Sequence, residues 1–393
     1  MAEVKFNMEN NVLTVFLCGH IDSANAAEIE AEITTEREKT PQENIIIDAE
    51  KLEYISSAGL RILLRIRKDM PDMKIINVSP EVYEILDMTG FTEMVTVEKA
   101  YRVISVDGCE VIGQGANGKV YRIDRDTIVK VYLNPDSLPD IHRERELARK
   151  AFVLGIPTAI PYDVVRVGDG YGSVFELLNA KSFAKIIIED PNKLDEVIKM
   201  SVDLLKKIHG TVVKKGDMPD MKEVVLNWAE FLKDYLPEEQ YNKLHSLVEA
   251  VPEDDHMMHG DYHLKNVMLQ DGEVLLIDMD TLCMGHPIFE LASVFNAYVG
   301  FSEIDHSVSM SFLGIPHETA EEIWEKTIRL YLGTDDEDVI TAVKEKAMIV
   351  GYTRIMRRTI RRNGLNTPDG QKQIEVCKMH LTDLLGRVDS LVF

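Results

Sequence analysis

The stretch HGDYHLKNVMLQDGEVLLIDMD, residues 259–280, contains polar residues whose types and spacing suit phosphoryl transfer. The apolar run 274–277 predicts a short strand that ends at Asp278 and holds its carboxylate at a fixed point. The preceding turn would hold Asp261 and Asn266 nearby. Two carboxylates and an amide oxygen that converge in this way would bind Mg²⁺, which takes hard oxygen ligands and shares them with substrate phosphates.

The same residues also provide a candidate base. In kinase-type phosphoryl transfer an Asp accepts the proton of the attacking hydroxyl, an Asn follows five residues later, and a metal-binding Asp lies beyond a strand. Asp261, Asn266 and Asp278 have this spacing. We therefore expect Asp261 to be the base and the other two to be Mg²⁺ ligands. A polar turn between two strands is the alternative for this stretch alone.

A glycine-rich segment, VIGQGANGKVYRI, is a candidate phosphate grip. Gly113, Gly115, Gly118 and Val120 fit the pattern G-x-G-x-x-G-x-V, and glycines let backbone N–H groups close over phosphates without side-chain collision. A dinucleotide-binding fold would need a helix directly after the glycines. The sequence instead predicts two strands around a turn at 125–126, which is the hairpin typical of a kinase.

Lys130 lies in the second of these strands among apolar neighbours, where a lysine is unexpected unless it is paired. Its candidate partner is Glu144, on a helix predicted over 139–154, and Glu146 is the alternative. In a kinase this lysine would hold the α- and β-phosphates of ATP, and the glutamate would orient it. An exposed lysine facing a solvated charged helix is the other interpretation.

Two further strands are predicted within 162–177, and they end at a segment expected to be the hinge. There Glu176 and Leu178 would offer backbone groups to adenine. Helices are predicted after it, at 192–209, 221–235 and 238–250.

Composition excludes several classes of protein. The net charge of −23 argues against a nucleic-acid partner, because phosphate backbones require basic patches. No run of 18 apolar residues predicts a membrane span, and the first residues lack a signal pattern. Four widely spaced cysteines indicate reduced thiols. We therefore expect a cytoplasmic protein with no membrane partner.

Strands and helices alternate over the first hundred residues, which predicts a small α/β domain. Helices are expected at 23–38 and 57–69, with Pro80 opening another. Strands are expected at 11–17, 44–48 and 74–78.

The patterns GHIDSANA, IIIDAEKLEYISSAGLRILL and ILDMTGF in this domain resemble the STAS domain of anti-sigma-factor antagonists. In that family a serine at the start of a helix is phosphorylated, and Ser57 is the matching position. A phosphate there would meet free N–H groups and the positive end of the helix dipole. A plain helix cap is the alternative. Ser56 stands where many antagonists have Asp, so the resemblance implies a sensory or docking domain, open to a protein partner, rather than a stand-alone sigma-factor regulator.

From residue 101 to about 300 the chain resembles the aminoglycoside phosphotransferase and choline kinase superfamily. The segments that carry this resemblance are GQGANGKVY, HGDYHLKN, IDMD and GHPIFELASVF, together with Lys130 and Glu144. The resemblance gives Asp261 the role of catalytic Asp, and it makes Asn266 and Asp278 the metal ligands. It also implies a structural His259, and it places Glu290 where the family usually has a loop-anchoring Asp. His263 either faces the phosphate or packs.

The acceptor should be a small hydroxylated molecule rather than a protein. Gly260 precedes the catalytic Asp, Met279 follows Asp278, and few residues remain before Glu290, so no activation segment is left to bind a peptide.

The C-terminal region is predicted to be helical at 317–332, 337–363 and 369–388. The acidic run 335–338 could attract a cationic acceptor on which Trp324 or Tyr331 would stack; surface charge and core packing are the alternatives. One broad helix face carries Arg354, Arg357, Arg358, Arg361 and Arg362. These arginines would pair with the acidic first domain or with an anionic acceptor, or form a solvated basic face.

Together these features predict an α/β STAS-like domain (1–100) and an α+β protein-kinase-like bilobal domain, with an N-lobe (101–180) and a C-lobe that has a helical C-terminal region (181–393). The predicted function is ATP- and Mg²⁺-dependent phosphorylation of a small-molecule hydroxyl. The alternatives are a nucleotide-binding regulatory protein and a protein serine kinase that signals through the first domain or acts on Ser57.

Overall fold

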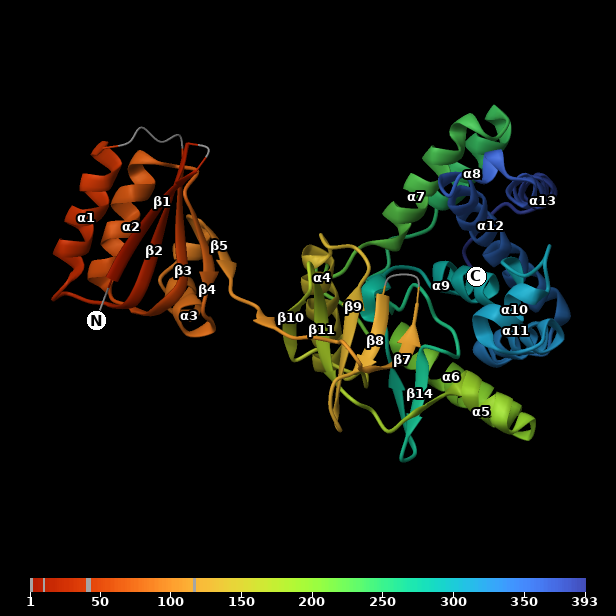
Figure 1. The fold of residues 1–393 in the computed structure, drawn as a ribbon. Coiled ribbons are helices and arrows are strands. Elements are labelled where there is room, and N and C mark those ends of the chain that lie inside the picture. Colours follow the sequence, from red (N-terminus) through yellow and green to blue (C-terminus); the bar gives the residue numbers. More distant parts are fainter. Residues whose placement is uncertain (1–2, 10, 40–43, 116–117) are drawn as a thin grey trace. The chain divides into compact units, whose positions relative to one another are not determined.

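The computed structural model describes residues 3–9, 11–39, 44–115 and 118–393. The chain forms two compact units, which are coloured along the sequence in Figure 1. One comprises Met1–Ser105 with Val164–Gly168, and the other comprises Val106–Asp163 with Asp169–Phe393.

The first unit is built on a five-stranded sheet in the order β1-β2-β3-β4-β5. Its strands are β1 (Glu3–Glu9), β2 (Val12–Ile21), β3 (Asn44–Ile55), β4 (Lys74–Val78) and β5 (Thr96–Lys99). β1 pairs antiparallel with β2, and the other pairs are parallel. Alternate residues of β2, such as Leu13 and Val15, are buried, as a half-covered sheet requires.

Three helices complete this sheet: α1 (Ala26–Lys39), α2 (Ser57–Asp69) and α3 (Pro80–Met88). Figure 1 shows α1 and α2 side by side, and the two helices are in contact. α2 has the bounds predicted from the sequence. A short strand, β6 (Arg102–Val103), pairs in parallel with β10 (Asp163–Val167), with Val165 opposite Arg102.

The second unit begins with antiparallel strands in the order β11-β9-β8-β7. They are β7 (Glu110–Gln114), β8 (Gly118–Arg122), β9 (Thr127–Tyr132) and β11 (Gly170–Glu176). β7 and β8 form the predicted glycine hairpin. Lys130 lies opposite Val120 on one side and Ser173 on the other. Helix α4 (Leu138–Val153) buries Ile141, Leu147 and Ala148.

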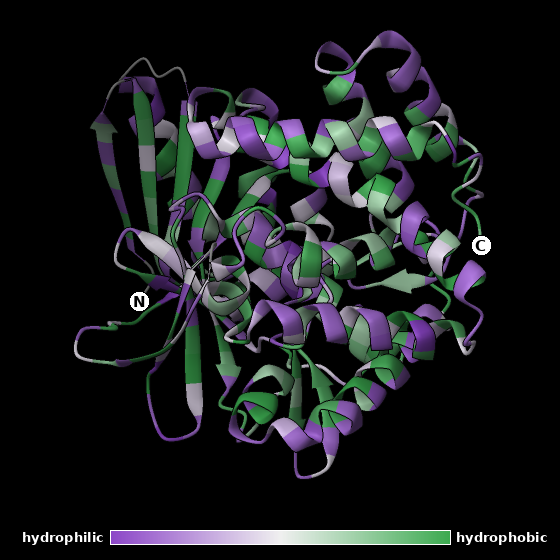
Figure 2. Ribbon diagram, turned by 90° about the vertical axis from the view of Figure 1, so that its right-hand side faces the viewer, coloured by the Kyte–Doolittle hydropathy of each residue, from purple (hydrophilic) through white to green (hydrophobic). Residues whose placement is uncertain are grey.

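The larger part of this unit is mainly helical. Its helices are α5 (Phe183–Glu189), α6 (Leu194–His209), α7 (Met221–Phe231), α8 (Glu238–Glu249), α9 (Ile288–Phe295), α10 (Ser307–Leu313), α11 (His317–Leu332), α12 (Glu337–Arg361) and α13 (Pro368–Leu385). Its short strands are β12 (Lys181–Ser182), β13 (Met257–Met258), β14 (Val267–Gln270), β15 (Glu273–Leu276) and β16 (Cys283–Met284). In Figure 2 many helices carry both hydrophilic and hydrophobic residues, as amphipathic helices around a core do.

These elements confirm the predicted fold class, an α/β domain and a bilobal kinase-like domain with a helical C-terminal region. The elements that were not predicted include β1, β5, α5, α9 and α10. Among the described residues, no helix combines the length and apolar character needed to cross a membrane.

Candidate active site

A cavity of about 700 Å³ lies in the second unit, between the sheet of the small lobe and the segment that contains Asp261. Every residue predicted from the sequence to serve nucleotide, metal or proton transfer lines it. These residues are Gly113, Gly115, Gly118, Lys130, Glu144, Glu176, Leu178, Asp261, Asn266 and Asp278. The turn of the glycine hairpin, residues 116–117, lies outside the described residues.

Lys130 connects the two lobes. Its Nζ lies 3.0 Å from Oε1 of Glu144 on α4 and 2.6 Å from Oδ1 of Asp278. Burial would lower the pKa of Lys130, but the charges of Asp278 and Glu144 raise it above its ordinary value. The lysine therefore stays positively charged. The alternative partner, Glu146, instead pairs with Lys150 on its own helix.

Tyr132 supports this pair and was missed from the sequence. Its hydroxyl donates to Oε2 of Glu144 at 2.5 Å and lies 3.3 Å from Ser173 Oγ. Burial raises the pKa of Tyr132 well above its usual range, so the hydroxyl keeps its proton. The strand period of two, which places Tyr132 on the same side of β9 as Lys130, was the available signal.

The segment predicted to be the hinge follows β11. The N–H of Leu177 donates to the carbonyl of Asp126 at 2.8 Å, which fixes the segment to the small-lobe sheet. Glu176 and Leu178 on either side of it reach the cavity.

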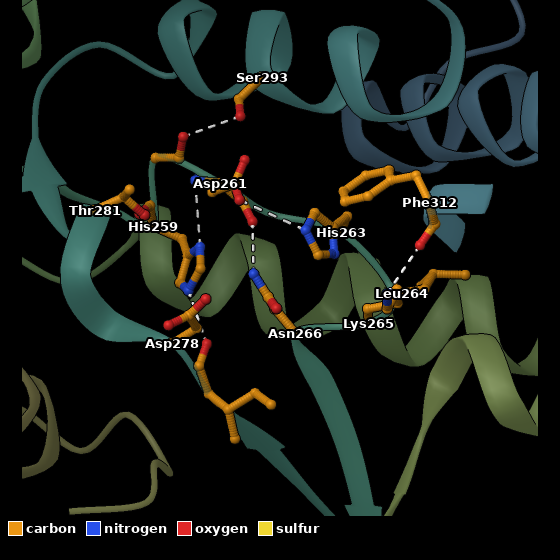
Figure 3. A network of polar contacts seen from close by, with 12 residues as sticks. His259, Asp261, His263, Leu264, Lys265, Asn266, Asp278, Thr281, Ser293 and Phe312 are labelled. Carbon is orange, nitrogen blue, oxygen red and sulfur yellow. Dashed lines mark hydrogen bonds and ion pairs between the residues drawn. The ribbon is translucent and has the colours of Figure 1, made fainter. Parts of the chain in front are cut away.

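His259 holds the loop around Asp261 in shape (Figure 3). Its Nε2 lies 3.2 Å from the carbonyl of Ile277, and its Nδ1 accepts the N–H of Asp261 at 3.3 Å. Gly260 has φ +81, and a Cβ there would lie 2.4 Å from the carbonyl oxygen of Thr281. Only glycine fits this position without displacing the backbone.

Glu290, on α9, anchors the same loop. Its carboxylate accepts the N–H of His259 at 2.5 Å and that of Gly260 at 3.1 Å. Burial would raise the pKa of Glu290, but the nearby His209 lowers it, with smaller contributions from His259 and the N–H of Gly260. The longer side chain at this position therefore still makes the contacts of a loop anchor.

Asn266 and Asp278 offer oxygen atoms to the cavity. The amide nitrogen of Asn266 donates to the backbone carbonyl of Asp261 at 3.1 Å, so its amide oxygen remains as the potential ligand. Asp278 has φ +66 and ψ +67, a left-handed conformation that is costly for a residue with a side chain. Carboxylate and amide oxygens are the donors that Mg²⁺ prefers, so this donor set fits that ion.

Two nitrogen-bearing side chains lie close to the Asp261 carboxylate. His263 Nε2 lies 3.6 Å from Oδ2, and Arg354 Nη2 lies 3.7 Å from Oδ1. Burial would raise the pKa of Asp261, but its interactions with His263, Arg354 and His259 lower it to about 2. The side chain is still 41% exposed, because it faces the cavity. His263 also packs edge-on against Phe312, so it both packs and contacts the site.

Asp280 is a further site residue that the sequence did not single out, and Arg354, singled out only as part of a basic helix face, lies beside the candidate base. Arg354, on α12, donates to the carbonyl of Gly260 at 3.2 Å and to Ser293 Oγ at 2.9 Å. It lies 94 positions after Gly260, so no local pattern connects them. Asp280 lines the cavity, and burial together with the charge of Asp278 raises its pKa to about 6. The second acidic residue of the segment IDMD was the sequence feature that could have identified Asp280.

The predicted aromatic acceptor contacts are wrong. Trp324 is 3% exposed and lies in the core, and the Tyr331 hydroxyl is 2.7 Å from His209 Nδ1. The acidic run 335–338 does not line the cavity among the described residues.

The N-cap of α2 is Ser56 rather than Ser57. Ser56 Oγ accepts the N–H of Ala58 at 3.2 Å, while Ser57 is the exposed first residue of α2. The alternative role of Ser57 as a plain cap is therefore wrong, and its hydroxyl is accessible.

Comparison with known proteins shows that two family models match the chain. The model of the phosphotransferase enzyme family matches residues 108–312, and the STAS domain model matches residues 3–103. The putative anti-sigma factor antagonist BtrV of Bordetella bronchiseptica is 32% identical over 92 residues, which cover 22% of this chain and 78% of that protein.

Solved structures of aminoglycoside phosphotransferases are similar at low identity. The gentamicin complex of APH(2")-IIa is 12% identical with a TM-score of 0.46, over 81% of this chain and 99% of that one. A thermostable mutant of APH(4)-Ia is 10% identical with a TM-score of 0.48, over 71% of this chain and 94% of that one.

Proposed function

The chain belongs to the phosphotransferase enzyme family and carries a STAS domain, and from this premise we propose that it transfers the γ-phosphoryl group of Mg²⁺-bound ATP under control of that domain. Membership makes the chain a small-molecule kinase that acts on hydroxyl groups. The nucleotide, the metal, the residue roles and the regulation are the proposed part.

The observation that carries the proposal is the position of Lys130, held between Glu144 and Asp278 at one side of a cavity that Asp261 also lines. In the proposed reaction Lys130 binds the α- and β-phosphates and Glu144 orients it. The glycine hairpin covers the phosphates with backbone N–H groups.

Adenine would lie against the hinge, with its edge facing the backbone of Glu176 and Leu178. When bound, Mg²⁺ would supply positive charge that stabilises the negative charge developing on the phosphate oxygens. Asn266 and Asp278 would hold it, because they present an amide oxygen and a carboxylate to the cavity.

Asp261 would accept a hydrogen bond from the acceptor hydroxyl and receive its proton as the new P–O bond forms and the bond from the γ-phosphorus to ADP breaks. Its low pKa keeps it ionised at neutral pH, so it can accept that hydrogen bond throughout the physiological range. Glu290, His259 and Arg354 hold the loop that presents it.

We propose that the STAS domain docks a protein partner or senses a signal, with Ser57 as the residue modified. Its exposure at the N-terminus of α2 supports this role, since a phosphate there would meet free backbone N–H groups.

The test is ADP release from Mg²⁺-ATP in the presence of aminoglycosides, choline, sugars or homoserine, with the Asp261→Asn variant as control. Acceptor-dependent ADP release that the variant lacks would support the proposal. Nucleotide binding without turnover would favour the regulatory alternative. Phosphate transfer to Ser57, lost in Ser57→Ala, would favour the protein kinase alternative.

A further inference from the structure

Three buried side chains of the small lobe form a chain of hydrogen bonds that ends on the partner of Lys130. Ser173 on β11, Tyr132 on β9 and Glu144 on α4 are 1%, 9% and 4% exposed. The Tyr132 hydroxyl lies 3.3 Å from Ser173 Oγ and 2.5 Å from Oε2 of Glu144. The chain therefore joins two neighbouring strands of the sheet to the helix that carries Glu144.

The hydrogen bonds of this chain run in one direction, from Ser173 towards Glu144. Burial raises the pKa of Tyr132, so its hydroxyl keeps one proton, which it donates to the Glu144 carboxylate because a carboxylate can only accept. With that proton engaged, the Tyr132 oxygen must accept the proton of the Ser173 hydroxyl. Hydrogen bonds in a chain polarise one another, so Ser173 strengthens the bond between Tyr132 and Glu144.

Glu144 needs a second donor because Lys130 serves more than one partner. Lys130 Nζ lies 3.0 Å from Glu144 Oε1 and 2.6 Å from Asp278 Oδ1, and in the proposed reaction it also binds phosphates. Among the described residues, Lys130 and Tyr132 are the two whose side chains bond the Glu144 carboxylate. Without the Tyr132 hydroxyl this buried carboxylate would depend on Lys130 alone, and it would compete with phosphates for the lysine.

We propose that Tyr132 is a positioning residue for phosphate binding. Its hydroxyl holds Glu144 in place while Lys130 exchanges Asp278 for the phosphates of ATP, and the bond can persist through that exchange because it does not involve the lysine. This inference rests on the proposed function, because it concerns the lysine of the same site. Tyr132 is not among the described residues that line the cavity, so it acts through Glu144 and Lys130 rather than on the nucleotide itself.

The test compares Tyr132→Phe with the wild-type full chain for two ligands, a non-hydrolysable ATP analogue with Mg²⁺ and adenosine. The substitution removes only the hydroxyl, and the ring whose centroid lies 5.3 Å from Lys130 Nζ remains. Calorimetry should show that analogue binding is weakened by about 10-fold, near the lower end for a lost hydrogen bond to a charged group, because the effect on the phosphates is indirect. Adenosine has no phosphates for Lys130 to bind, so its affinity should change by less than about 2-fold. A purely structural defect would weaken the binding of both ligands.

Tyr352→Phe is the matched control. The Tyr352 hydroxyl also bonds a carboxylate, at 3.0 Å from Glu303 Oε2, and its side chain is buried, but it is not among the described residues that line the cavity. We expect a similar loss of stability in urea and a change in analogue affinity below about 2-fold. Ser173→Ala should weaken analogue binding by about 3-fold in the wild-type background and add nothing in Tyr132→Phe, because it acts through Tyr132.

Unchanged analogue affinity in Tyr132→Phe would overturn the proposal, and so would an equal loss in Tyr352→Phe or an equal loss of adenosine affinity. A wild-type chain that does not bind the analogue with Mg²⁺ would contradict the proposed use of ATP, and the inference would fail with it. Wild-type binding therefore distinguishes a failure of the positioning role from a failure of the proposed function.

Discussion

Replacing Asp261 by Asn tests the proton-accepting role most directly. The two side chains have nearly the same shape, so the loop held by His259 and Glu290 should keep its conformation. With a pKa of about 2, Asp261 is ionised at pH 7. So weak a base does not take the proton of a free alcohol, and we expect it to orient the hydroxyl and receive the proton late in the transfer.

The expected loss in kcat is about 10²- to 10⁴-fold, the range for removing a general base. This corresponds to about 3–5 kcal/mol of transition-state stabilisation. A lost hydrogen bond to a charged group would supply about 1.5–3 kcal/mol of it, and loss of the proton acceptor the remainder. The KM for ATP should change little, because Asp261 would contact the acceptor rather than the nucleotide.

The assay is kcat against pH from 5 to 9 with the acceptor identified by screening. The wild type should show no inflection from Asp261 in this range, because its pKa in the folded protein is lowered to about 2. The contribution of this carboxylate to stability is likewise present above about pH 4 and is lost only as the pH falls towards 2. Asp271→Asn, at an exposed turn, is the matched control. Wild-type kcat in Asp261→Asn, or a wild-type inflection near pH 6–7 that the variant lacks, would refute the reasoning.

Three further variants test other parts of the molecule. Asp278→Ala should abolish Mg²⁺-dependent turnover and keep the circular dichroism spectrum, so wild-type turnover at saturating Mg²⁺ would exclude Asp278 as a ligand. Glu290→Gln should lower the free energy of unfolding by about 2–4 kcal/mol, because an amide group would meet two backbone donors. Tryptophan fluorescence in urea reports the second unit alone, since both tryptophans lie in it. An unchanged urea midpoint would contradict the anchoring role. Ser57→Asp should differ from Ser57→Ala in kinase activity and in radius by solution scattering, because it imitates part of the charge of about −1.5 to −2 that phosphate adds; identical values in both and in the wild type would exclude a switch there.

The sequence predicted the site best where chemistry and spacing are local. Asp261, Asn266 and Asp278 come from one strand-turn-strand segment, so their separations alone indicated convergence. Lys130 was identified because a lysine among apolar strand residues requires a partner. The helix at 317–332 was predicted with the bounds of α11 because its apolar residues recur at helical spacing.

Contacts between distant elements could not be predicted. Arg354 reaches Gly260 only because α12 packs against α9, which follows from the core and not from any motif. Ser57 was considered a possible cap, but the structure gives that role to Ser56, since helix ends depend on backbone angles that a sequence does not specify.

The arginines of α12 illustrate the same limit. Their spacing indicated one basic face, for which docking to the first domain, acceptor binding and solvation were all open. In the structure Arg354 bonds the loop of the candidate base, while Arg357 and Arg358 lie over aromatic rings. Three of the five are thus engaged within the kinase domain.

The ion pairs of Lys130 should couple the binding of phosphate to the binding of a cation. Its charge is balanced by Glu144 and Asp278, and the latter contact spans the two lobes. Lys130 can exchange Asp278 for a phosphate at low cost only if Asp278 gains another cation, because a carboxylate left unpaired beside phosphates would be repelled. Phosphate binding at Lys130 and cation binding at Asp278 should therefore be coupled, each raising the affinity for the other by the same factor. A phosphate or a cation that bound alone would have to break the 2.6 Å ion pair between Lys130 and Asp278, and it would leave one of these two side chains without a new partner.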